Sequence, residues 1–144
     1  MSRAFQIWTA SWSSALPDGF VRVGISRGVP RRIRGYLRYR GLEPGVWFHE
    51  ASEEVFTGRY LAEVLSRLDP HDLVRDLELR SGGRPVALSC WEQVGKGWCH
   101  RGLAAWWIGR HTGMLVQEVG HEGAGLGHPM LPQSGEARTL LQSA

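Results

Sequence analysis

The sequence predicts an α/β fold: a small single-domain layered structure with a mostly parallel short sheet flanked by helices. Apolar runs of strand length alternate with segments of helical spacing, and no internal repeat interrupts this order. The chain has 144 residues, of which 42% are hydrophobic and 22% charged. This length fits one domain, and the composition supports a hydrophobic core and excludes a wholly disordered chain.

The first half of the chain contains two expected strands and a long loop. Residues 5–9 (FQIWT) predict a strand that ends at the polar stretch SWSSALPDG, and residues 20–25 (FVRVGI) predict a second. Residues 26–50 are rich in Gly, Pro and Arg, which favours a long functional loop.

Two helices are expected next. Ser52 is a good N-cap, Glu53 and Glu54 suit the first turn, and apolar residues then follow helical spacing as far as residue 68. Asp69 followed by Pro70 is typical of a new helix start, and this second helix should run to about residue 77.

The remaining elements complete the alternation. Residues 85–89 (PVALS) predict a buried strand, residues 99–110 a helix, and residues 114–119 a final strand. The helix should place Trp106 and Trp107 in the core. Gly, His, Pro and Ser dominate residues 120–144, so we expect a domain over residues 1–119 and a flexible tail after it.

Charge is unevenly distributed along the chain. Residues 1–40 hold eight arginines and one acidic residue, Asp18, whereas residues 41–80 hold four arginines and nine acidic residues. Lys96 is the single lysine. Arginine suits phosphate and carboxylate better than lysine does, so this usage favours an anionic partner; a base-composition bias of the genome explains the usage equally well but not its clustering.

The location of the protein is predicted from what the sequence lacks. No apolar run reaches the ~18–20 residues that cross a bilayer, and the first residues contain no continuous apolar segment of a secretory signal. We therefore expect a cytoplasmic protein that binds no membrane. In a reducing cytosol, Cys90 and Cys99 should be thiols, metal ligands or core residues rather than a disulfide.

Polar residues follow several of the expected strands. Thr9 and Ser11 end the first strand, the Ser26-Arg27-Gly28 turn follows the second, and Cys90 follows the third. Cys99, His100 and Arg101 open the next helix. If the strands are parallel, these groups meet outside the carboxyl edge of the sheet, where ligands of α/β proteins bind.

Three stretches resemble an uncharacterised bacterial family, the domain of unknown function family 488. They are WTASW with VGISRGVPR, then RYLAEVLSRLDPHDLVRDL, and finally VALSCWEQVGKGWCHRGLAAWWI, which together cover about residues 7–110. The sequence departs from the family pattern at Trp91, between Cys90 and Glu92, and in its Gly/His-rich tail. The resemblance implies a compact α/β fold with a site at these motifs, and it implies no established activity.

Two residues are candidates for catalysis. Cys99, at a helix start beside Arg101 and His100, has surroundings that favour a thiolate nucleophile; alternatively it is a small buried residue. Glu92 is either a general base or ribose ligand, or a surface acid. The residue six positions after Cys99 is Ala105, so the Cys-x5-Arg loop of phosphatases is absent.

No metal or cofactor is predicted. Cys90, Cys99, His100 and His111 are potential zinc ligands, but zinc sites usually pair ligands two to four residues apart. Only Cys99 and His100 are close in sequence, and adjacent residues at a helix start should point in different directions.

The aromatic residues allow two interpretations each. Trp91 and Trp98 flank the cysteine loop and either stack on a flat ligand or close the loop onto the core. In the long loop, arginines alternate with tyrosine rings, which suits contacts with the phosphates and bases of a nucleic acid; a solvated loop would explain the same pattern. The residues are Arg31, Arg32, Arg34, Tyr36, Arg38, Tyr39 and Arg40.

The function predicted is the binding of a small anionic, nucleotide- or nucleobase-like ligand at the carboxyl edge of the sheet. Hydrolase or transferase chemistry through Cys99 and Glu92 is an open extension of this reading. The alternative is a nucleic-acid-binding accessory module that uses residues 31–40.

Overall fold

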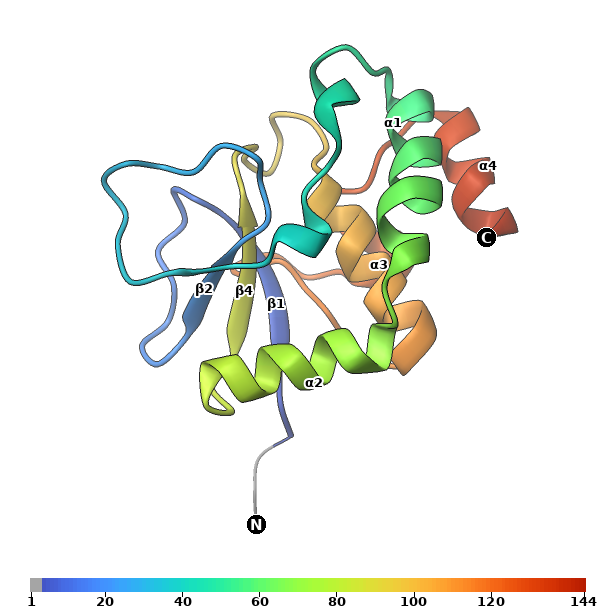
Figure 1. The fold of residues 1–144 in the computed structure, drawn as a ribbon. Coiled ribbons are helices and arrows are strands. Elements are labelled where there is room, and N and C mark those ends of the chain that lie inside the picture. The colour runs from blue at the N-terminus through green and yellow to red at the C-terminus, as the bar shows by residue number, and fades with distance from the viewer. Residues whose placement is uncertain (1–3) are drawn as a thin grey trace.

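Four parallel strands form one sheet in the order β1-β4-β2-β3 in the computed structural model, which describes residues 4–144. Figure 1 shows β4 between β1 and β2. The strands are β1 (Ile7–Ser11), β2 (Val21–Gly24), β3 (Leu37–Arg38) and β4 (Val86–Cys90). All five residues of β4 are buried, because this strand pairs with β1 and β2 on its two edges. The predicted parallel α/β fold is confirmed.

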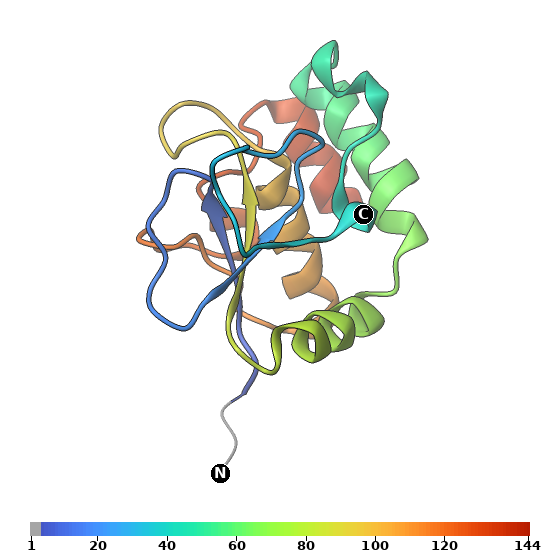
Figure 2. The same cartoon turned by 60° about the vertical axis from the view of Figure 1, so that its left-hand side comes forward.

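The helices lie on one side of the sheet and loops cover the other, as Figures 1 and 2 both show. Helix α3 (His100–Thr112) packs on β1 and β4, and α2 (Pro70–Ser81) contacts α3. Helices α1 (Glu53–Arg59) and α4 (Gly135–Ser143) pack against each other. Trp106 and Trp107 of α3 are buried in the core, as predicted.

Two predicted helix starts are confirmed by their caps. The Ser52 hydroxyl accepts a hydrogen bond from the Val55 N–H at 3.3 Å, and the Asp69 carboxylate accepts from the N–H groups of His71 and Asp72. The first predicted helix is shorter than expected, since α1 gives way to a π-helical turn (Tyr60–Val64) and a 3₁₀ turn (Leu65–Arg67). The buried Tyr60 hydroxyl donates to the Leu42 carbonyl at 2.6 Å and ties this turn to the loop.

The prediction of a flexible tail over residues 120–144 is wrong. Ser134 caps α4, and the Glu53 carboxylate accepts hydrogen bonds from the N–H groups of Gln133 and Ser134, both at 3.1 Å. Buried apolar side chains fix the segment against the core; they are Met130, Leu131, Ala137 and Leu141. The composition of residues 120–144, rich in turn-forming residues, predicted flexibility, but the segment is ordered and packs on α1 and α3.

The predicted final strand over residues 114–119 is replaced by an isolated bridge between Thr9 and Glu118. Two backbone hydrogen bonds flank it, from Thr9 N–H to Gln117 O and from Val119 N–H to Thr9 O. A turn that returns from Glu118 to His121 ends the pairing. Residues 26–50 form a long loop that contains β3 and two 3₁₀ turns, Arg40–Leu42 and Val46–His49.

Among residues 4–144, the structure contains no helix with both the length and the apolar character needed to span a bilayer.

Candidate functional site

A cavity of about 630 Å³ opens at the carboxyl ends of β2 and β4. Its size lies in the range of small-molecule sites. Seven residues predicted from the sequence line it: Ser26, Arg27, Gly28, Cys90, Trp91, Glu92 and His100. Parallel pairing of β2 with β4 brings these two groups of residues together, as the sequence argument required.

Aromatic rings form much of the cavity wall. Trp91 and Trp98 come from the loop after β4, Phe48 and His49 from the long loop, and Phe56 from α1. Trp98 packs edge-on against Phe56 with ring centroids 4.7 Å apart. The Trp91 side chain is about half exposed, yet its indole N–H donates to the Gly28 carbonyl at 3.0 Å. Trp91 is therefore a fixed ring at the cavity rim.

The Ser26-Arg27-Gly28 turn also lines the cavity, next to Trp91. The buried Ser26 hydroxyl accepts from the Trp12 indole N–H at 2.9 Å and donates to Gly28 O. Arg27 is exposed and donates to the Pro44 carbonyl at 3.2 Å, which holds its guanidinium at the cavity wall, 6.0 Å from the Phe48 ring centroid. Arg27 and Glu92 are the oppositely charged side chains on the wall.

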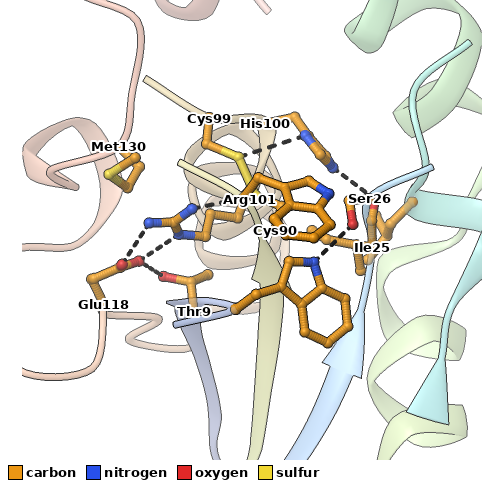
Figure 3. The surroundings of a disulfide bond; sticks show 12 residues. Thr9, Ile25, Ser26, Cys90, Cys99, His100, Arg101, Glu118 and Met130 are labelled. Atoms are coloured by element: carbon orange, nitrogen blue, oxygen red, sulfur yellow. Dashed lines mark hydrogen bonds and ion pairs between the residues drawn. A yellow bond between two sulfur atoms is a disulfide. The ribbon is translucent and has the colours of Figure 1, made fainter. Parts of the chain in front are cut away.

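Cys90 and Cys99 are joined by a disulfide, which contradicts the expectation of free thiols. Cys90 ends β4 and Cys99 is the N-cap of α3, so the loop between them returns the chain to the carboxyl edge of the sheet. Figure 3 shows the disulfide lying between two side chains: His100 approaches the Cys99 sulfur from one side, and Arg101 approaches the Cys90 sulfur from the other.

The assignment of Cys99 as a nucleophile is not supported in this state. Its sulfur is bonded to Cys90, and Cys90 rather than Cys99 faces the cavity. Glu92, the other predicted catalytic residue, is exposed at the cavity wall, where it can accept a hydrogen bond from a ligand.

His100 is buried and points its two ring nitrogens at different partners. Nε2 lies 2.7 Å from the Ile25 carbonyl, so Nε2 carries the proton, and Nδ1 lies 3.7 Å from Cys99 Sγ with its lone pair toward the sulfur. Burial lowers the pKa of His100 to about 4, opposed by the hydrogen bond to Ile25. The imidazole is therefore neutral at pH 7.

Arg101 and Thr9 belong to a buried network rather than to the cavity, which corrects their prediction as ligand contacts. Arg101 donates to both oxygens of Glu118, at 2.8 and 2.7 Å, and its third contact is Cys90 Sγ at 3.3 Å. The Thr9 hydroxyl donates to Glu118 at 2.7 Å and accepts from His128 Nε2 at 2.8 Å. His128 Nδ1 accepts from the Met130 N–H, which fixes this tautomer.

Ser11 lies outside the cavity as well. Its hydroxyl is within 3.0 Å of Ser13 Oγ and 2.9 Å of Ser14 Oγ, and these serines line a separate hollow of about 240 Å³ with Glu118 and His121. The position of β1 in the sheet explains this placement, because β4 separates β1 from β2, whose end lines the cavity.

Three potential metal ligands meet beside the cavity. The ligand atoms of Cys90, Cys99 and His100 lie within 4.8 Å of one another, and all three residues are buried. Cys99 and His100 do not point apart, contrary to the prediction, because the N-cap backbone is extended and turns both side chains inward. His111 lies at the far end of α3, where it is exposed and packs edge-on against Trp107.

The Arg-rich loop is divided in the structure. Arg31, Arg32, Arg34 and Arg40 are exposed, whereas Arg38 forms an ion pair with Glu43 at 2.7 Å. Tyr36 packs edge-on against Trp12, and Tyr39 packs on the core beneath Arg80. Both tyrosine rings are thus engaged within the protein.

Sequence reasoning missed several residues of the site. Phe48, His49 and Phe56 were not singled out, although WFHEASEEVF places aromatic rings on both sides of a predicted helix start. The buried network beside the site was missed as well, because Glu118 and His128 lie where a strand and a flexible tail were expected.

Comparisons with protein-family models, with curated proteins and with solved structures find no match to this chain. The resemblance to the bacterial domain of unknown function family 488 stays a prediction.

Proposed function

We propose that the protein binds a small flat anionic molecule, of nucleotide or nucleobase type, in the cavity at the carboxyl ends of β2 and β4. The observation that carries this proposal is the combination, in one cavity, of aromatic lining residues with an arginine, Arg27, that Pro44 O holds in place. Trp91, fixed by its bond to Gly28 O, offers a ring face for stacking, which is worth roughly 1–3 kcal/mol per base.

Arg27 is the anion contact in this proposal. Its guanidinium is exposed and uses one nitrogen on Pro44 O, so its remaining donors can bind phosphate or carboxylate in a forked geometry. Glu92 accepts a hydrogen bond from a ring N–H or a ribose hydroxyl. Arg101 takes no part, because Glu118 already neutralises it inside the core.

Two variants of cavity residues and one control variant outside the cavity test this proposal. The probes are the four common ribonucleoside 5′-monophosphates, their free bases and inorganic phosphate, titrated while tryptophan fluorescence and thermal unfolding are recorded. Arg27→Gln and Trp91→Ala should weaken binding at least ~10-fold, whereas Arg31→Gln, on the same loop but outside the cavity, should bind as the wild type does. The proposal fails if no probe binds the wild type, or if Arg31→Gln weakens binding as much as Arg27→Gln.

Nucleic-acid binding by residues 31–40 is the second candidate. Three exposed arginines favour it, since Arg31, Arg32 and Arg34 have no acidic partner among residues 4–144. Without free tyrosine rings such binding would depend on phosphate contacts and weaken steeply with salt. Single-stranded and duplex oligonucleotides titrated at several salt concentrations test it, with the triple Arg→Gln variant of these residues as the binding-deficient control.

A further inference from the structure

We propose that reduction of the Cys90–Cys99 disulfide creates a zinc site made of the two cysteine thiolates and His100 Nδ1. Two sulfurs and one imidazole nitrogen match the ligand preference of Zn²⁺, and the three atoms already lie within 4.8 Å of one another. The ligand set is that of zinc sites with three protein ligands and one open position. This inference goes beyond the ligand cavity and does not depend on it.

The orientation of His100 supports the site. Histidine ligands of metals commonly donate their other ring N–H to a carbonyl or carboxylate, which fixes the tautomer and aims the lone pair. Here Nε2 donates to the Ile25 carbonyl at 2.7 Å, and Nδ1 lies 3.7 Å from Cys99 Sγ and within 4.8 Å of Cys90 Sγ. The outer hydrogen bond of a metal-bound histidine is therefore already present.

Charge balance also favours the site. Two thiolates neutralise one Zn²⁺, so the complex adds no net charge to a buried position. Arg101 donates to Cys90 Sγ at 3.3 Å, which stabilises that sulfur as a thiolate, and the bidentate contact with Glu118 neutralises the guanidinium.

The backbone leaves room for the sulfurs to separate onto a metal. The Cα atoms of Cys90 and Cys99 are 7.3 Å apart, beyond the 4.4–6.8 Å that is usual between disulfide partners, and each Zn–S bond is about 2.3 Å.

A dithiol reductant transfers two electrons and two protons to the disulfide and is itself oxidised to a disulfide. Zn²⁺ then displaces both thiol protons.

The fourth coordination position would face the cavity. Cys90 and His100 line the cavity, whereas Cys99 does not. When bound, Zn²⁺ would act there as a Lewis acid toward a water molecule or an anionic ligand group. The oxidised chain lacks both thiolates, so metal binding depends on the redox state of the protein.

Metal titration of the full chain tests the proposal. Zn²⁺ is added to reduced, metal-free protein in competition with a chromophoric chelator, and Co²⁺ is used to detect thiolate-to-metal charge-transfer bands. We expect one Zn²⁺ per reduced chain and none per oxidised chain. Cys90→Ser and His100→Gln should each lower affinity at least ~100-fold, whereas the control His111→Asn, on the same helix, should not.

Two results would overturn the proposal: no Zn²⁺ bound to the reduced wild type, or undiminished binding in both ligand variants. If the variants fail to fold, the rate at which Cys90 and Cys99 of the reduced wild type are alkylated, with and without Zn²⁺, is measured instead. Zn²⁺ should then slow alkylation of Cys90 and Cys99 at least ~10-fold, and unchanged rates would equally refute the site.

Discussion

Arg101 and Glu118 form a bidentate ion pair in the interior, with Nε–Oε1 and Nη2–Oε2 distances of 2.8 and 2.7 Å and exposed side-chain fractions of 0% and 2%. The pair joins the first turn of α3 to the segment that bridges β1. Thr9 satisfies Glu118 further, and Cys90 Sγ accepts the remaining Arg101 contact. The arginine next to the candidate metal ligands is thus a fixed part of the core.

Removing one partner of this pair should strongly destabilise the protein. Glu118→Gln leaves the Arg101 charge buried without a counter-ion, so the free energy of unfolding should fall by about 3–5 kcal/mol in urea denaturation. Glu63→Gln is the matched control, because Arg59 also contacts Glu63 through Nε at 2.7 Å and Nη2 at 3.4 Å, but the two side chains are 45% and 41% exposed. Similar losses in both variants would contradict a special role for the buried pair.

Reduction of the disulfide should also lower stability. The bond closes a loop of nine residue spacings, for which loop-closure entropy gives about 2–3 kcal/mol at 25 °C. Chemical unfolding with and without a phosphine reductant, in metal-free buffer, measures this difference, and Cys90→Ser should show no response to the reductant. Two free thiols in the native, unreduced protein would show that the bond does not form in solution.

Stability should decline as the pH falls below neutral, in part because of His128. Burial lowers the pKa of His128 to about 4 from an ordinary 6.5, opposed by the Glu118 charge. The unfolded chain takes up a proton below pH 6.5, whereas the folded chain does so only near pH 4, so stability falls across this interval by up to about 3 kcal/mol. His100 contributes in the same direction.

The variant His128→Gln isolates this contribution. A glutamine amide can still donate to Thr9 but does not titrate. The unfolding free energy of the variant should therefore fall less between pH 7 and pH 4.5 than that of the wild type. An equal pH dependence in the two proteins would show that His128 is not the titrating group.

The sequence was sufficient for features that depend on local pattern. The apolar run PVALS predicted the buried strand that the structure shows as β4, and the Ser52 and Asp69 caps were recognisable because capping needs a few neighbouring residues. Strand ends then placed Ser26, Arg27, Cys90 and Trp91 at one edge, because parallel strands carry their carboxyl ends together.

Features that depend on distant contacts were not predictable in this way. Arg101 was predicted to contact a ligand because its true partner, Glu118, is 17 residues away in the sequence. Glu118 lies in a segment that was expected to be a strand but forms only isolated bridges, so nothing local indicated the ion pair. The order of residues 120–144 arises from burial of Met130 and Leu141 against the domain, and local composition does not record such packing.

The contact between Gly102 and Met130 gives a direct test of that last segment. A Cβ atom on Gly102 of α3 would lie 2.5 Å from the Met130 carbonyl carbon and 2.6 Å from its oxygen, both backbone atoms that cannot move alone. Gly102→Ala should therefore push residues 128–131 off the helix and lower the free energy of unfolding by about 1–3 kcal/mol, despite the better helix propensity of alanine. The Cys99 N–H to Met130 O hydrogen bond, 2.9 Å long, should open with it.

Gly58→Ala is the control for this substitution. Gly58 lies in α1, and its Cβ would meet only Leu140 Cδ1 at an ordinary 3.8 Å, so alanine there should be neutral or stabilising by up to about 1 kcal/mol. Hydrogen exchange distinguishes the two outcomes, since only Gly102→Ala should accelerate exchange at the N–H groups of Cys99 and Leu131, which bond to Met130 O and His128 O. If residues 120–144 were a flexible tail in solution, both alanine variants would be stabilised alike, because nothing would then stand against the face of α3 at Gly102.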